Sequence, residues 1–248
     1  AYAVLAPNPP NRQPWLLELA GSATIRIYCE LDRRLPVTDP RDRQILIGFG
    51  AFLELLRMAA AQDGIALEVE SFPDGLPGNR LDERPIAAIR QVGGTVEADP
   101  LFAHVLARHT NREPYRRDAI PAAAAAALRT AMPDAPDYRL HSGADEVAAL
   151  RAVTIAGFDR EMRTPRAHLE SVHLMRSGRA EINANPDGIS LGGPTIEFAR
   201  LAALVSAEGL ADPDSTASRQ GVDKLLPAAP APPAIVRPST PDYRRHTH

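Results

Sequence analysis

The chain is poor in cysteine, lysine and aromatic residues, and several classes of protein are excluded by what it lacks. Its 248 residues include one cysteine, Cys29, which excludes an intramolecular disulfide and a cysteine-based metal cluster. Lys224 is the only lysine, so a preference for arginine is compositional and not in itself functional. No apolar run approaches the roughly 20 residues of a membrane span. The formal net charge of −3 gives no basic field for nucleic acid or an anionic membrane.

The remaining composition is that of an ordinary globular protein. Hydrophobic residues make up 44% and charged residues 24% of the chain, enough for one large domain or two small ones with real cores. Cys29 falls in an apolar, strand-like run, which predicts a buried and inert thiol.

Periodicity and turn residues predict the main elements. Asp39 as N-cap and Pro40 as first helical residue predict a helix that ends at Gly64. Before it, residues 15–19 and 24–31 predict a hairpin, with a turn at Gly21. The other expected elements are strands at 67–72, 86–92 and 138–141, a short helix ending at Arg108, and helices from Pro121, over 144–163 and in pieces between 165 and 208.

Three patterns are rejected as sites. Gly48-Phe49-Gly50 begins like a dinucleotide loop but lies inside the predicted helix, where no strand precedes it. His168 and His173, with Glu170 between them, are five residues apart, whereas a zincin helix needs four, so a solvated helix face is predicted instead of a metal site. No G-x-S-x-G nucleophile elbow occurs.

Two segments carry chemistry. In the first, a proline-rich loop after residue 6 presents the carboxamides of Asn11 and Gln13 and the ring of Trp15. Carboxamides donate and accept at once, which suits the mixed edge of a flavin or pterin ring. The alternative is a helix-to-strand turn in which Trp15 only anchors the core.

The second segment is Arg108-His109-Thr110-Asn111-Arg112, where two guanidinium groups, a hydroxyl and an imidazole gather at a helix exit. Such a group can hold a phosphate by charge-assisted hydrogen bonds. A solvated basic loop is the alternative, and composition alone favours it.

Together the segments resemble the nitroreductase-like FMN-binding family. A-P-x-x-x-N-x-Q-P-W is similar to that family's flavin-ring loop, and the second segment to its R-[RH]-[ST]-x-[KR] phosphate element. The resemblance implies that Asn11 hydrogen-bonds the isoalloxazine while Gln13 and Trp15 shape the loop. It further implies that the phosphate end is held by Arg108, Thr110 and Arg112, with His109 alongside.

The order of the segments resembles that of the family's two-repeat, Acg-like branch, which often carries a twin-arginine export signal, and the resemblance implies the following division of the chain. Residues 1–98 are then a first nitroreductase-like half, and 99–224 the start of a second half with a lid-like insertion at 163–209. Residues 225–248 are a Pro/Ala-rich tail with too few apolar anchors to fold. Two departures stand out: Pro10 replaces a usual histidine, and the family's C-terminal strand, helix and flavin contacts have no counterpart here.

The resemblance implies an α+β fold, with a mixed, mostly antiparallel sheet flanked by helices in a single-chain pseudo-dimer. It implies FMN as cofactor, NAD(P)H as reductant and a small-molecule acceptor of the nitroaromatic or quinone type. No catalytic side chain is assigned, because the flavin carries the chemistry. The alternatives are a protein that binds or sequesters flavin without turnover and a remnant that binds none. A periplasmic or a cytoplasmic location, and a monomeric pseudo-dimer or a homo-oligomer, also stay open.

Overall fold

A computed structural model describes the protein over residues 1–21, 23–110, 118, 120–130, 138–201, 207–212, 215, 219 and 235–238. The chain forms two compact units, and each is described by itself. The first contains residues 1–110 together with 174–198; the described residues of the second lie within 118–173 and 199–238. The boundaries of these units differ from those of the predicted halves, 1–98 and 99–224. Residues 174–198, which lie within the predicted lid-like insertion, belong to the first unit.

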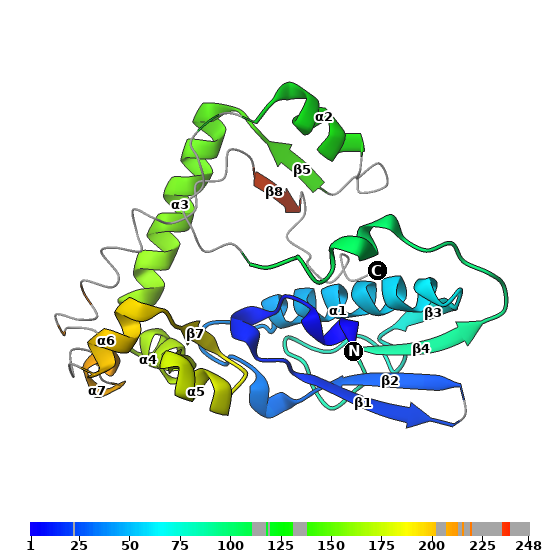
Figure 1. The fold of residues 1–248 in the computed structure, drawn as a ribbon, viewed down its shortest axis with the longest axis horizontal. Coiled ribbons are helices and arrows are strands. Elements are labelled where there is room, and N and C mark those ends of the chain that lie inside the picture. Colours follow the sequence, from blue (N-terminus) through cyan, green and yellow to red (C-terminus); the bar gives the residue numbers. More distant parts are fainter. Residues whose placement is uncertain are drawn as a thin grey trace. The chain divides into compact units, whose positions relative to one another are not determined.

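A four-stranded antiparallel sheet forms the base of the first unit (Figure 1). Its strands, in spatial order, are β1 (Trp15–Ala20), β2 (Thr24–Cys29), β4 (Ala87–Val92) and β3 (Ala66–Ser71). In the β1–β2 hairpin Trp15 pairs with Cys29 and Ala20 with Thr24. The predicted hairpin and the two later strands are therefore confirmed.

Helix α1 (Arg43–Gln62) covers one face of this sheet. Alternate strand residues such as Ile27 and Ile89 point toward it and are buried with Phe49 and Phe52. In the described part of the chain, α1 is the one helix long and apolar enough to cross a membrane. Its apolar side chains instead fill the space above the sheet, so α1 is the core helix of this unit.

The opposite face of the sheet is polar. Tyr28 donates to the Glu18 carboxylate at 2.6 Å, Arg26 pairs with Asp74 at 3.1 Å, and Arg90 with Glu68 at 3.4 Å. Hydrophobic and polar residues alternate in this way along β2 and β3, as in an antiparallel sheet with one packed and one solvated face, whereas Leu16, Leu17 and Leu19 of β1 are exposed.

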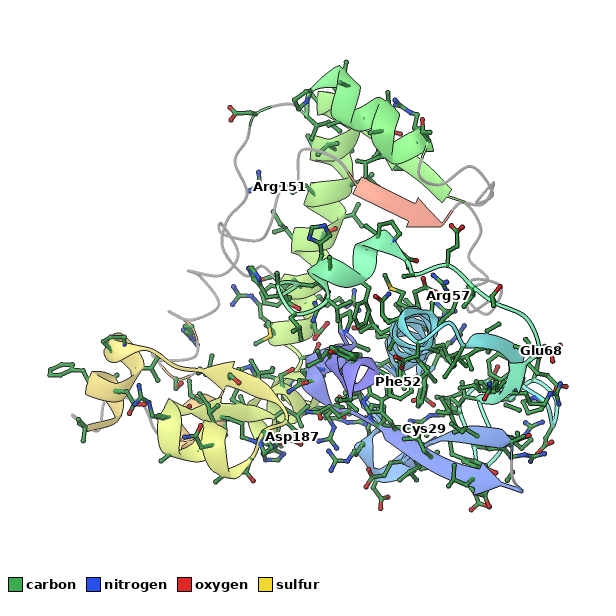
Figure 2. All side chains as sticks on the ribbon, turned by 45° about the vertical axis from the view of Figure 1, so that its right-hand side comes forward. Cys29, Phe52, Arg57, Glu68, Arg151 and Asp187 are labelled. Atoms are coloured by element: carbon green, nitrogen blue, oxygen red, sulfur yellow. The ribbon has the colours of Figure 1, made fainter. Side chains whose placement is uncertain are left out.

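Cys29 lies on the packed face of the sheet and is 4% exposed. Figure 2 labels it together with Phe52 of the same core. Burial raises the pKa of its thiol to about 12, with the Asp42 carboxylate adding to the shift. The expected buried thiol is confirmed, and it stays protonated at neutral pH.

The start of α1 differs from the prediction. Asp39 does cap the helix, since its carboxylate accepts from the amides of Arg43, Gln44 and Ile45 at 2.9–3.1 Å. However, Pro40 lies in a turn outside the helix, which begins at Arg43. The buried Asp42, with a left-handed φ of 55°, is the residue before that start, and its carboxylate accepts from the Leu81 amide at 2.8 Å. Two carboxylates therefore fix the beginning of the core helix.

Short elements complete the first unit. Tyr2 of η1 (Tyr2–Leu5) meets Phe102 of η4 (Pro100–His104) edge-on, with ring centroids 4.8 Å apart. The predicted helix through Arg108 is thus a 3-10 turn that ends at His104. The others are η2 (Pro9–Asn11), η3 (Leu31–Arg33), β6 (Met175–Ser177), α5 (Gly178–Ala184), β7 (Ile189–Leu191) and α6 (Pro194–Leu201), which runs on into the second unit. β6 and β7, which the sequence did not predict, pair in parallel.

The second unit contains the predicted α2 (Ala122–Thr130), β5 (Tyr138–His141) and α3 (Ala144–Met162), with α4 (Pro165–His173) and α7 (Ala207–Ala211). β8 (Ile235–Pro238) pairs with β5, a strand that the composition of 225–248 does not predict. The solvated-face prediction is wrong for His168, which is 3% exposed with Nε2 2.7 Å from the Leu210 carbonyl oxygen. Within the described ranges, no group of His, Cys, Asp and Glu side chains could hold a metal ion.

At the level of fold class, an antiparallel sheet flanked by helices agrees with the predicted α+β nitroreductase-like arrangement. The two-repeat pseudo-dimer and the lid stay predictions.

Replacing Asp39 by alanine should lower the free energy of unfolding by about 2 kcal/mol, because three first-turn amides lose a buried acceptor. Urea unfolding followed by the fluorescence of Trp15, the only tryptophan, measures this. The matched control is Asp63→Ala at the exposed C-terminal end of α1, expected to change stability by less than about 0.5 kcal/mol. Equal effects at the two ends would contradict the capping role.

Candidate functional site

The predicted flavin-ring loop, here called the ring loop, comprises residues 6–15 and connects η1 to β1. Hydrogen bonds of the Asn8 side chain hold its shape. The Asn8 side-chain oxygen accepts from the Gln13 amide at 2.8 Å, and its nitrogen donates to the Ala6 carbonyl at 3.0 Å. One carboxamide thereby ties the two ends of the loop together, as an Asx residue commonly does in a turn. Asn8 was not among the predicted site residues, because its contacts are to backbone within the loop.

The loop approaches α1 closely at Gly48. A side-chain carbon built at Gly48 would lie 2.9 Å from the Cβ of Asn8, closer than such atoms come in real proteins. Gly48 therefore lets the loop lie directly on the core helix. The Gly48-Phe49-Gly50 pattern has a packing role here and lies inside α1, as the sequence indicated.

The backbone of the loop is strained where its predicted ligands lie. Asn11 and Gln13 have φ values of 58° and 48°, so they account for two of the four non-glycine residues with positive φ in the described chain. Left-handed backbone is uncommon for a non-glycine residue, and this conformation is less favourable for glutamine than for asparagine. Such strain clusters at ligand-binding sites, where surrounding contacts hold it.

The carboxamides of Asn11 and Gln13 converge on one oxygen atom. Asn11 Nδ2 donates to the Pro186 carbonyl at 3.3 Å, and Gln13 Nε2 donates to the same oxygen at 2.8 Å. Gln13 Nε2 also lies 3.3 Å from Asn11 Oδ1, so the two side chains form one unit. The arrangement is a double donor for a carbonyl-type acceptor.

Trp15 points into the core. Its ring lies edge-on to Phe49, with centroids 5.0 Å apart, and tilted against Phe52 at 4.9 Å. Its buried Nε1 has no hydrogen-bond partner among the described residues. In this structure Trp15 anchors the end of the loop, which is the alternative considered for it above.

Residues 108–110, the described part of the arginine segment, contact the chain just before the ring loop through Arg108. Arg108 donates to the Leu5 carbonyl at 3.0 Å, across 103 residues of sequence. His109 Nδ1 lies 3.1 Å from the Ala107 carbonyl oxygen, and His109 and Thr110 are exposed. Arg112 lies outside the described residues. The structure thus places Arg108 against Leu5, the residue before the loop that carries Asn11 and Gln13.

A cluster around Asp187 was missed by the sequence reasoning. Its carboxylate lies 2.8 Å from Arg176, 3.3 Å from Arg12 and 3.6 Å from Arg33 (Figure 2 labels Asp187). Burial lowers the pKa of the Arg12 guanidinium, and the charge of Asp187 opposes that shift. Arg12 stands between the two carboxamides in sequence, but a contact across 175 residues leaves no local signal.

Comparison with known proteins supports the nitroreductase-like resemblance. No protein-family model matches the chain. It is 34% identical over 116 residues to the protein named "Putative NAD(P)H nitroreductase acg" in each of two strains of Mycobacterium tuberculosis. The match covers 46% of this chain and 33% of the relative, so the chain spans about a third of the length of the curated relatives that it matches.

Gly48→Ala should destabilise the protein by about 1–3 kcal/mol, because the added methyl group must displace the loop at Asn8. Gly50→Ala is the matched control on the same helix: nothing lies within 4 Å of its Cβ position, and alanine there should add up to about 1 kcal/mol of stability. Urea midpoints of the two variants measure the difference. Stabilisation by both would show that the loop does not lie on Gly48.

Proposed function

We propose that this chain binds FMN and serves a nitroreductase-like oxidoreductase, with NAD(P)H as reductant and a nitroaromatic or quinone-type acceptor. The convergence of Asn11 and Gln13 on the Pro186 carbonyl oxygen is the observation that carries the proposal. The sequence similarity to a protein named as an NAD(P)H nitroreductase supports the reaction class.

The donor set fits a flavin. The edge of the isoalloxazine ring presents carbonyl oxygens and an N–H, and a carboxamide pair can meet both kinds of group. Pro186 supplies a carbonyl oxygen to this pair within the protein itself, which demonstrates that its donors can share such an acceptor. Asn11 and Gln13 would therefore hold the ring edge.

The phosphate end would be held by the arginine segment. Arg108 is exposed and lies at the start of the ring loop, and Thr110 is exposed two residues later. We propose that Arg108 and Thr110 bind the phosphate together with Arg112, and that His109 lies alongside. Guanidinium groups suit this role because their donors pair with phosphate oxygens in a fixed fork.

Bound FMN would supply the redox chemistry, by accepting a hydride from the nicotinamide and passing electrons to the acceptor. The chain's own contribution is to bind and orient. Asn8 and Gly48 fix the loop, the two carboxamides set the position of the ring edge, and Trp15 anchors the loop to the core. No acid or base side chain is assigned a step.

The contributions of the ring end and the phosphate end of the proposed site can be distinguished by comparing the binding of FMN with that of riboflavin, which lacks the phosphate. Replacing Arg108 and Arg112 together by alanine should abolish FMN retention after desalting but leave riboflavin affinity unchanged. Asn11→Ala should instead weaken both flavins by a similar factor, about fivefold for one lost hydrogen bond. Quenching of Trp15 fluorescence and the flavin absorbance bands report binding.

Arg129→Ala, on the exposed surface of α2, is the matched arginine control and should change neither affinity. Unchanged FMN retention in the Arg108/Arg112 double variant would overturn the phosphate assignment. A chain that binds neither flavin at any accessible concentration would overturn the proposal. Flavin binding without NAD(P)H oxidation in the presence of an acceptor would identify a sequestering protein instead.

A further inference from the structure

The segment Pro186–Gly188 clasps the ring loop through backbone and side-chain contacts. Besides the Pro186 carbonyl with its two carboxamide donors, the Gly188 amide donates to the Asn11 carbonyl at 3.3 Å. Gly188 has a φ of 77°, and a side chain there would overlap the Leu174 carbonyl oxygen. The Ile189 amide donates to that same oxygen at 2.7 Å, which holds the clasp against β6.

The clasp occupies two of the four carboxamide N–H donors that would hold a flavin, and a third is used between Gln13 and Asn11. Gln13 Nε2 donates to the Pro186 carbonyl oxygen and to Asn11 Oδ1. Asn11 Nδ2 donates to the same Pro186 oxygen. Three N–H donor positions of the four in this pair are therefore engaged. A ring carbonyl and the Pro186 carbonyl cannot accept from the same hydrogens at once.

We infer that Pro186 is an internal competitor for the flavin-binding carboxamides and that Asp187 is the positioning residue that holds it there. This inference rests on the proposed function. Flavin binding then requires the clasp to open, so the observed affinity is the intrinsic affinity multiplied by the open fraction. Asp187 sets that fraction through its ion pairs with the arginines.

These ion pairs are suited to reversible closure. The side chains of Arg12, Arg176 and Asp187 are 14%, 15% and 21% exposed, and that of Arg33 is 35% exposed. The cluster is therefore mostly buried and is most open at Arg33, so added salt weakens its ion pairs only in part. Arg12 is held independently, because it also donates to the backbone carbonyls of Asp32 and Arg33. Arg12 would therefore stay in place while Asp187 leaves.

The test compares the 248-residue chain with its Asp187→Asn variant, using riboflavin as the probe because it carries no phosphate charge. The variant should bind riboflavin about fivefold more tightly, the factor that corresponds to about 1 kcal/mol. In about 1 M NaCl, where the screening length is about 3 Å, the wild-type protein should gain affinity while the variant should not change. Asp74→Asn, which breaks the exposed pair with Arg26, is the control and should leave affinity unaltered.

Hydrogen exchange of the backbone amides of residues 187–190 gives a second readout that needs no turnover. Competition predicts faster exchange at Gly188 when flavin binds, and faster exchange in unliganded Asp187→Asn. Slower exchange on flavin binding would overturn the inference, because the clasp would then close over the ligand. Equal riboflavin affinity in variant and wild type would also overturn it, with the FMN assignment intact. Binding of flavin by neither protein would instead overturn the assignment and the competition with it, whatever the exchange rates show about the clasp.

Discussion

The close approach of the ring loop to helix α1 is the constraint on which the candidate site depends. At Gly48 the helix has no side chain, and Asn8 occupies the space where one would lie. Asn8 can then bond the Ala6 carbonyl and the Gln13 amide. The core helix therefore determines where the carboxamides lie, because Asn8 joins the helix directly to their loop.

The core helix is itself held in two places, at its N-terminal end and by packing along its length. Asp39 and Asp42 are buried at its N-terminal end, and each bonds backbone amides rather than a ligand. Along the helix, Phe49 and Phe52 pack on Trp15, which ends the ring loop. The loop is thus held at Asn8 on one side and at Trp15 on the other, so the positive φ values of Asn11 and Gln13 lie between two fixed points. Strain persists in such a place because the surroundings determine it.

Much of this arrangement could be predicted from local sequence, and the rest could not for a physical reason. The β1–β2 hairpin and α1 follow from period-two and helical patterns, and Asp39 was identifiable as a cap. The start of α1 was misplaced because Asp39 reaches its amides from a preceding turn. Asn11 and Gln13 were named from their chemistry, but their partner Pro186 is 175 and 173 residues away. A single sequence records no such pairing.

The charges around Asp187 explain how the segment Pro186–Gly188 can hold the ring loop although it does not belong to the hydrophobic core. Three guanidinium groups face the carboxylate, and Glu30 accepts from Arg33 at 2.6 Å, so the cluster keeps a net positive charge while Asp187 is present. Loss of Asp187 would leave the three arginines facing one another with only Glu30 to offset them. Their repulsion favours the closed clasp, but hydration of the partly exposed groups limits that preference. The contact between this segment and the loop therefore rests on partly exposed ion pairs and on three hydrogen bonds, from Asn11, Gln13 and the Gly188 amide.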